Sequence, residues 1–217
     1  MEYYKLFNYK YFNFNFFVNI VFIITNFIFI YYGFNLIPIL VTISGIYLAL
    51  IFNKYNCQVT IFPYFYLAIP FYLLIYLNNH YLDGKIIILW VLSIVSASDS
   101  SAYVFGNLIK GKKLLPRISP NKTWSGFIFS LIFSIISSSV FSFYFNLFNV
   151  NLSMLLGFII GLSSTFGDLF ESYLKRINNK KDTSKIIPGH GGLLDRLDGF
   201  LFAIVIMFFF ILLWSNS

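Results

Sequence analysis

Long uninterrupted runs of apolar residues are the feature that most limits how this chain can fold. A helix needs about 20 such residues to cross the hydrocarbon core of a membrane. Seven segments approach that length, at residues 16–32, 36–52, 60–77, 86–105, 126–147, 152–170 and 200–214. The runs are continuous rather than alternating, which argues against membrane-spanning strands. The sequence therefore predicts an all-α polytopic membrane protein, a bundle of about seven transmembrane helices.

The composition agrees with a chain that lies mostly in lipid. Only 11% of the residues are charged and 59% are hydrophobic, whereas a soluble domain carries about 25% charged residues. Cys57 is the single cysteine, which excludes an intramolecular disulfide and a cysteine metal cluster.

The basic residues define the predicted orientation. Every lysine and arginine except Lys85 falls on one side of the predicted membrane. Positively charged loops stay in the cytoplasm, so this side is predicted to be cytoplasmic, with the amino terminus inside and the carboxyl terminus outside. The net charge of +7 is then explained by contact with anionic lipid, and we expect no nucleic acid partner.

The polar residues divide the chain at about residue 96. Residues 1–95 are predicted to form amino-terminal transmembrane helices, and 96–217 a catalytic transmembrane region with cytoplasmic loops at 106–125 and 171–199. Within the fourth apolar run, one helical face carries Ser96, Asp99, Ser100, Tyr103 and Asn107. A carboxylate at membrane depth is costly and usually faces a cavity or a partner. We predict that Asp99 lines a polar cavity, and the alternative is hydrogen bonding between helices.

The loop at 106–125 is basic and rich in turn residues. Its lysines and arginine can neutralise phosphate, and Ser119 and Thr123 can donate hydrogen bonds to it. The alternative is an ordinary positive loop at the lipid headgroups.

The segment from Gly167 to Gly199 is the most informative. Asp168, Glu171, Ser172 and Lys175 would share one face of a helix that leaves the membrane. Asp195 and Asp198 stand three residues apart before the last run. Carboxylates without cysteine indicate magnesium, which is held by one or two carboxylates plus substrate phosphates.

A glycine cluster follows Pro188 in the same segment. Gly189, Gly191 and Gly192 flank His190, and their amides can form an anion-binding nest, or simply a tight turn. We favour a structural or substrate-contacting role for His190 over a metal ligand. Acids, bases and glycines together are what phosphoryl or nucleotidyl transfer requires.

The spacing in this segment resembles a known family. The chain reads Ser172-Tyr-Leu-Lys175-Arg176, Lys181-Asp182-Thr-Ser184, Pro188-Gly-His190-Gly191-Gly192 and Asp195-Arg196-Leu-Asp198. These residues look like the signature of phosphatidate cytidylyltransferases, also called CDP-diacylglycerol synthases. Upstream, Asp99–Tyr103 and Ile118–Trp124 are also similar to family segments.

The resemblance implies an activity and a set of site residues. The reaction would be CTP + phosphatidate → CDP-diacylglycerol + pyrophosphate, with magnesium, and potassium beside it, in a bacterial inner (cytoplasmic) membrane. Asp168 and Asp195 match the metal ligands, and Asp198, Lys175 and Arg176 complete the implied catalytic set. The substrate contacts it implies are Asp99, Ser119, Lys122, Thr123, Ser172, Lys181, Asp182, His190, Gly191, Gly192 and Arg196. A homodimer is also implied.

The chain departs from the family pattern at Asn107, where a basic residue is usual, at Ser125, where a Glu is usual, and at Gly199, where a Ser is usual. Two other functions stay open on the residues alone. Asp195-x-x-Asp198-Gly199 begins like the motif of CDP-alcohol phosphotransferases, although the later aspartates of that motif are absent. Asp99 and Asp168 could instead serve an ion-coupled transporter.

Overall fold

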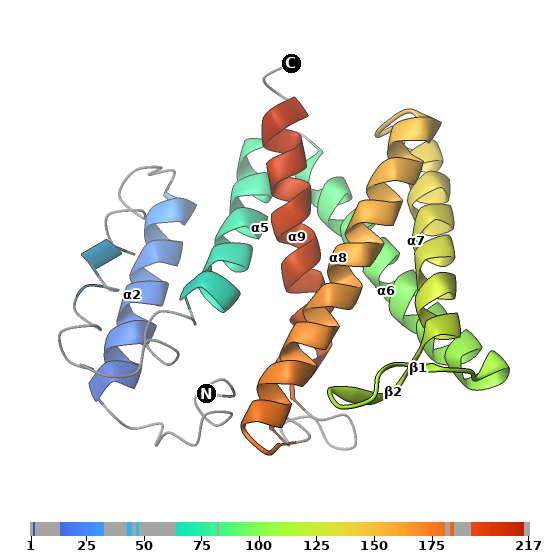
Figure 1. Cartoon of the computed structure of the whole chain (residues 1–217). Helices are drawn as coiled ribbons and strands as arrows, with labels where there is room; N and C mark the ends of the chain where they lie inside the picture. The colour runs from blue at the N-terminus through green and yellow to red at the C-terminus, as the bar shows by residue number, and fades with distance from the viewer. Residues whose placement is uncertain are drawn as a thin grey trace.

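A computed structural model describes residues 2, 14–32, 43–44, 47, 64–81, 83–180, 183–184 and 192–214. Figure 1 shows these residues as a bundle of helices with one small hairpin. The helices are α2 (Phe14–Tyr31), the π-helical turn η1 (Tyr64–Ala68), α5 (Ile69–His80), α6 (Gly84–Ile109), α7 (Trp124–Phe145), α8 (Val150–Ile177) and α9 (Leu194–Trp214). The strands are β1 (Lys113–Leu115) and β2 (Ser119–Thr123).

In the described part of the chain, four helices are long and apolar enough to cross a membrane. They are α6, α7, α8 and α9, and they confirm the coarser prediction of a mostly helical membrane protein. The predicted span at 36–52 lies almost wholly outside the described residues. The predicted span at 60–77 corresponds to η1 and α5, and Pro70 lies in the first turn of α5, where its missing amide costs no hydrogen bond.

Two of the long helices extend well beyond their predicted bounds. Helix α8 continues past residue 170 to Ile177, and α9 begins at Leu194 rather than at residue 200. Hydropathy misses both extensions because their residues are polar. Lys175 pairs with Glu171 one turn earlier at 3.2 Å, and such pairs stabilise a helix. The acidic residues of this region therefore stand on rigid helices.

The core lies where α5, α6, α8 and α9 meet. Trp90, Ile94, Ile160, Ile204 and Met207 are fully buried there. The indole Nε1 of Trp90 donates a hydrogen bond to the carbonyl oxygen of Ser138 at 3.0 Å, so the largest core side chain also ties α6 to α7.

Helices α7 and α8 approach closely through small residues. A methyl group on Gly157 would lie 2.6 Å from Cβ of Ser138, and one on Gly161 would collide with Ser134. Ser138 Oγ donates to the carbonyl oxygen of Ser153 at 2.5 Å across the interface. Close packing and interhelical hydrogen bonds of this kind hold helices together in lipid.

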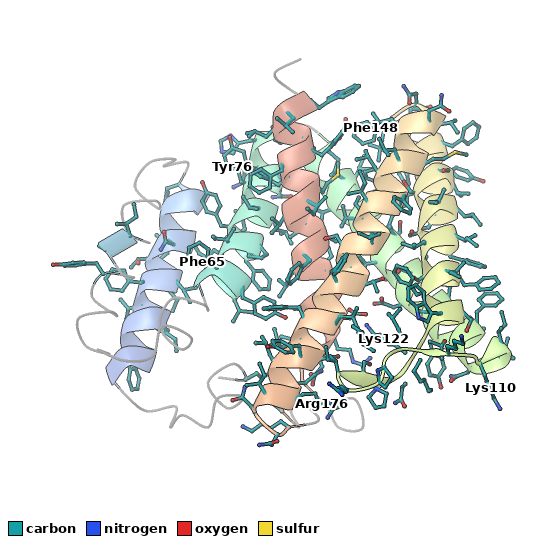
Figure 2. All side chains as sticks on the ribbon, viewed as in Figure 1. Phe65, Tyr76, Lys110, Lys122, Phe148 and Arg176 are labelled. Carbon is teal, nitrogen blue, oxygen red and sulfur yellow. The ribbon has the colours of Figure 1, made fainter. Side chains whose placement is uncertain are left out.

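The polar elements gather at one end of the bundle. In Figure 1 the β1–β2 hairpin, the carboxyl end of α8 and the amino end of α9 all lie at the bottom, opposite the carboxyl terminus. Figure 2 places Lys110, Lys122 and Arg176 at this same end. The sequence predicts the site among these same polar segments.

Candidate active site

The site is built on a close crossing of α8 and α9. A methyl group on Gly167 of α8 would lie 2.5 Å from the carbonyl oxygen of Asp198. A methyl group on Gly199 of α9 would lie 2.5 Å from Ser164 Oγ and 2.9 Å from Asp168 Oδ1. Both distances are shorter than van der Waals contact, so the two glycines allow the helices to touch. The crossing brings Asp168 of α8 beside Asp198 of α9.

Four carboxylates form what we call the acidic cluster: Asp168, Glu171, Asp195 and Asp198. The Asp198 carboxyl group is close enough to both Asp168 and Glu171 to interact with them. Glu171 in turn lies next to Asp195, and Asp99 of α6 is near enough to Asp168 to interact through its charge. The cluster thus joins α8 to α9, and Asp99 of α6 lies beside it.

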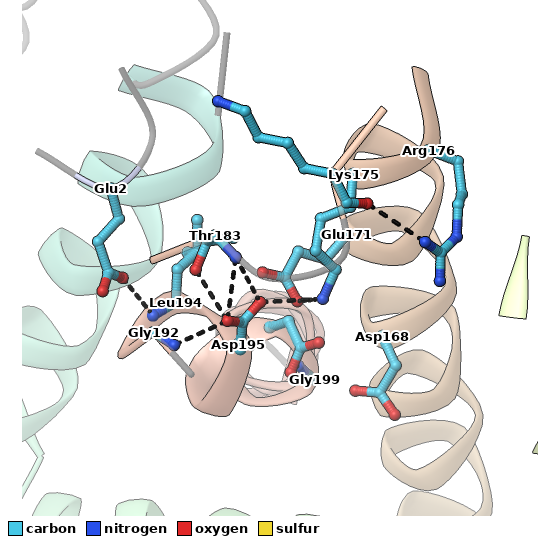
Figure 3. A network of polar contacts seen from close by, with 12 residues as sticks. Glu2, Asp168, Glu171, Lys175, Arg176, Thr183, Gly192, Leu194, Asp195 and Gly199 are labelled. Carbon is cyan, nitrogen blue, oxygen red and sulfur yellow. Dashed lines mark hydrogen bonds and ion pairs between the residues drawn. The ribbon is translucent and has the colours of Figure 1, made fainter. Parts of the chain in front are cut away.

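Two lysines pair with this cluster, as Figure 3 shows in part. Lys175 Nζ lies 2.9 Å from Asp195 Oδ1 and 3.2 Å from Glu171 Oε2. Lys122 Nζ lies 2.8 Å from Asp168 Oδ2. The other carboxylate oxygen of Glu171, Oε1, is buried without a hydrogen-bond partner. Negative charge is therefore in excess among the described side chains, which favours the binding of a cation.

Asp195 organises the start of α9. Its Oδ2 accepts hydrogen bonds from the Gly192 amide at 2.8 Å and from the Thr183 hydroxyl at 2.9 Å, and the Thr183 amide lies 3.2 Å away. Together with Lys175, these donors surround both oxygens of Asp195. Asp195 therefore holds both Thr183 and Gly192 close to Lys175 of α8.

Glu2 is a site residue that the sequence did not reveal. Its carboxylate accepts hydrogen bonds from the amides of Leu193 at 2.9 Å and Leu194 at 2.7 Å, and from the Ser184 hydroxyl at 2.5 Å. The amides at the start of a helix have no partners within it, so Glu2 caps α9 (Figure 3). The one available signal was that Glu2 is the only acidic residue before Asp83.

The hairpin carries Lys122 to the cluster. Strands β1 and β2 pair antiparallel, with Leu115 opposite Ser119. Arg176 Nε of α8 donates to the carbonyl oxygen of Ile118 at 3.1 Å, which holds the turn of the hairpin against α8. The sequence predicted a basic loop at 106–125, and the structure shows that α6 occupies its start and the hairpin most of the rest.

Thr123 ends the hairpin and starts α7. It is buried, and its hydroxyl oxygen accepts a hydrogen bond from the Gly126 amide at 3.1 Å. Ser125, one of the departures from the family pattern, donates to the carbonyl oxygen of Lys110 at 2.6 Å. These contacts fix the hairpin relative to α6 and α7.

A cavity of about 510 Å³ opens beside the cluster, between α6, α7, α8 and the hairpin. Three residues of the predicted polar face of α6 line it: Asp99, Tyr103 and Asn107. The other two residues of that face, Ser96 and Ser100, are not among the lining residues, whereas Ser98 is. The other lining residues are Ala102, Gly106, Lys113, Leu114, Asn121, Lys122, Thr123, Gly126, Phe127, Ser130, Thr165 and Asp168. The prediction that Asp99 lines a polar cavity is confirmed.

The remaining predicted residues fall into two groups. Lys181, Asp182, His190 and Gly191 lie outside the described residues. Ser119 lies on β2, Ser172 is half-buried on α8, and Arg196 is exposed on α9. Gly192 is buried, and its amide donates to Asp195.

The donor chemistry of the cluster fits magnesium. Carboxylate oxygens are the ligands that this ion prefers, and Glu171 Oε1 is a buried oxygen without a hydrogen-bond partner. Among the described residues, no three acidic, histidine or cysteine side chains converge tightly enough to hold a metal by themselves. Magnesium commonly completes its coordination with water and substrate phosphates.

Comparison with known proteins decides the family. The model of the cytidylyltransferase family matches residues 1–214. The chain belongs to the cytidylyltransferase family. Its relatives in that family include the phosphatidate cytidylyltransferase of Helicobacter pylori, 34% identical over 169 residues, which cover 76% of this chain and 62% of the relative.

Two staphylococcal members of the family are similar over a shorter stretch. The phosphatidate cytidylyltransferases of Staphylococcus haemolyticus and Staphylococcus aureus are 42% and 41% identical over 127 residues, covering 58% of this chain and 48% of each relative. The chain therefore spans about three fifths of the Helicobacter relative's length and about half of the staphylococcal ones.

Proposed function

We propose that this chain transfers CMP from CTP to phosphatidate, giving CDP-diacylglycerol and pyrophosphate for phospholipid synthesis. The observation that carries the proposal is the acidic cluster with Lys122 and Lys175 beside it, at the polar end of a membrane bundle. A cation site and paired lysines suit a reaction between two phosphate-bearing substrates, and relatives of this chain bear the name of that activity.

The chemistry follows from the substrates. A phosphate oxygen of phosphatidate attacks the α-phosphorus of CTP, and the bond from that phosphorus to the bridging oxygen of the β-phosphate breaks. The bridging oxygen leaves with pyrophosphate, so no side chain needs to form a covalent intermediate. Lys122 and Lys175 lie where they can neutralise phosphate oxygens, and with Arg176 and the predicted Lys181 they would favour the charged transition state.

Magnesium is part of the proposal, with potassium beside it. Asp168 and Asp195 are the predicted ligands. Asp198 is a further candidate ligand because it lies beside Asp168. The oxygens of Asp195 already accept hydrogen bonds from protein donors. When bound, the metal would screen the phosphates and polarise the phosphorus that is attacked.

We also propose the arrangement in the membrane. About seven helices would span a bacterial inner membrane, with the amino terminus and the polar end of the bundle in the cytoplasm, where CTP is available. The basic residues of the hairpin and of the end of α8 support this orientation. Assembly as a homodimer is part of the same proposal.

The test is conversion of labelled CTP and phosphatidate to a CDP-lipid by membranes that carry the chain, with and without EDTA. We expect EDTA to stop conversion, and Asp168→Asn or Asp195→Asn to lower the rate at least about 100-fold without loss of inserted protein. Asp83→Asn is the matched control, because Asp83 makes no side-chain cap at the far end of α6.

Three outcomes would count against the proposal. Full activity of both cluster variants would remove the cluster from the reaction. Exchange of CMP onto a free alcohol instead of phosphatidate would favour a CDP-alcohol phosphotransferase. Solute or ion flux that does not depend on CTP would favour the transporter.

A further inference from the structure

We propose that the cavity between α6, α7 and the hairpin receives the cytosine base of the nucleotide, and that Asp99 selects it by accepting a hydrogen bond from its exocyclic amino group. The inference rests on the proposed function and adds to it the residue that would distinguish CTP from UTP.

The first observation is that Asp99 faces the cavity with free acceptor capacity. Its side chain is accessible although α6 is packed against α7 and α8, because it lines the cavity. Lys122 and Arg196 act on it through their charge, but Lys122 makes its ion pair with Asp168. No hydrogen bond or salt bridge to Asp99 is present among the described residues.

A carboxylate only accepts hydrogen bonds when it is ionised. Asp99 therefore favours a ligand that presents a donor at this depth. Cytosine carries an amino group at position 4, and carboxylates accept from that group in known base recognition. Uracil carries an oxygen at the same position, which would face the carboxylate lone pairs with no hydrogen between them.

The second observation is the wall around Asp99. Tyr103 and Phe127 bring aromatic rings to the same cavity, and base–aromatic stacking is a common source of affinity for nucleotides. Asn107 and Asn121 add amide groups that can both donate and accept. At about 510 Å³, the cavity falls in the range of small-molecule sites, about 300–1,000 Å³.

The third observation is continuity with the acidic cluster. Lys122 and Asp168 line the same cavity as Asp99, so a nucleotide whose base lies at Asp99 has its phosphates directed toward the cluster.

The test is the ratio of kcat/KM for CTP to that for UTP in the wild-type chain and in Asp99→Asn. An amide can turn either its oxygen or its NH₂ group to the base, so Asp99→Asn should accept both. We expect the CTP/UTP ratio to fall about 10- to 100-fold, the size of one hydrogen bond to a charged group. The magnesium requirement and the KM for phosphatidate should not change, and Asp83→Asn should keep the wild-type ratio.

A wild-type measurement keeps the inference testable if the variant does not fold. The triphosphate of pyrimidin-2-one riboside, which carries a hydrogen atom in place of the 4-amino group of cytosine, should bind the purified chain about 10- to 100-fold more weakly than CTP in the absence of phosphatidate. Tyr103→Leu should weaken CTP and UTP equally, since stacking does not depend on the group at position 4.

The outcomes separate this inference from the proposed function. An unchanged CTP/UTP ratio in Asp99→Asn, or equal binding of CTP and the pyrimidin-2-one analogue by the wild type, would overturn the role of Asp99. A variant that instead needs more magnesium or potassium would identify Asp99 as an ion ligand and overturn the inference as well. Neither of these results bears on the proposed function, which would be contradicted by a wild-type chain that forms no CDP-lipid.

Discussion

At the scale of single residues, Gly199 explains both a packing feature and a departure from the family pattern. The resemblance predicts a serine there, but in this chain Ser164 and Asp168 already occupy the space that a Cβ would need. The glycine is what allows Asp168 and Asp198 to lie side by side.

We expect Gly199→Ala to destabilise the chain by about 1–3 kcal/mol, the usual cost of inserting a group into a packed interior, and to lower CMP transfer because it displaces Asp168. Thermal unfolding in detergent and the CTP assay measure the two effects. Ser164→Gly removes the nearest obstacle, so the double variant should recover part of both losses. A Gly199→Ala chain as stable as the wild type would show that the helices can separate without cost.

The sequence predicted which residues belong to the acidic cluster better than it predicted which of them lie side by side. The i, i+3 and i+7 spacing placed Asp168, Glu171 and Lys175 on one helical face, and the pair of Lys175 with Glu171 follows from it. The contact of Asp168 with Asp198 does not follow from spacing, because it depends on where two helices cross. That crossing point is set by Gly167 and Gly199.

At the scale of elements, Thr123 joins the hairpin to α7. An N-terminal cap satisfies one of the amides that a helix leaves unpaired, and this cap also fixes the strand that carries Lys122. The interpretation of Thr123 as a phosphate donor stays a prediction, since its hydroxyl oxygen accepts from Gly126 while its proton is still available, with Ser125 Oγ 3.0 Å away.

Thr123→Ala should lower the free energy of unfolding by about 1 kcal/mol, and Thr123→Ser should retain most of it, because serine caps equally well. Thermal unfolding in detergent measures both. Ser139→Ala is the control, since it removes a hydroxyl that bonds to the Ile135 carbonyl within the same helix without capping anything. Equal losses in Thr123→Ala and Thr123→Ser would argue that the methyl group, not the cap, matters.

The helices were predictable where they cross the lipid, because a membrane span must be continuously apolar. They were less predictable at the polar end of the bundle. Hydropathy located α6 and α7 within a few residues of their bounds, but it missed the last turns of α8 and the first turn of α9, which are helical and polar. It also missed the hairpin, since strands of three and five residues leave no periodic signal in a basic segment.

At the scale of the whole molecule, the hairpin and the link between α7 and α8 lie at opposite ends of the bundle (Figure 1). The proposed orientation puts the hairpin in the cytoplasm. In a chain whose single cysteine has been replaced by Cys57→Ser, Asn151→Cys should react with an impermeant maleimide in spheroplasts. Lys112→Cys should react only after the membrane is opened. Both positions are exposed. The reverse pattern would invert the orientation and place the cluster away from CTP.

The cap that Glu2 provides has a consequence for the order in which the protein matures. Glu2 lies before α2 in the sequence, whereas Leu194 begins α9, and the two meet across 192 positions. Contacts between such distant residues form late, because a long loop must close first. The Glu2 cap on α9 is therefore expected to form only after the helices between the two residues have packed.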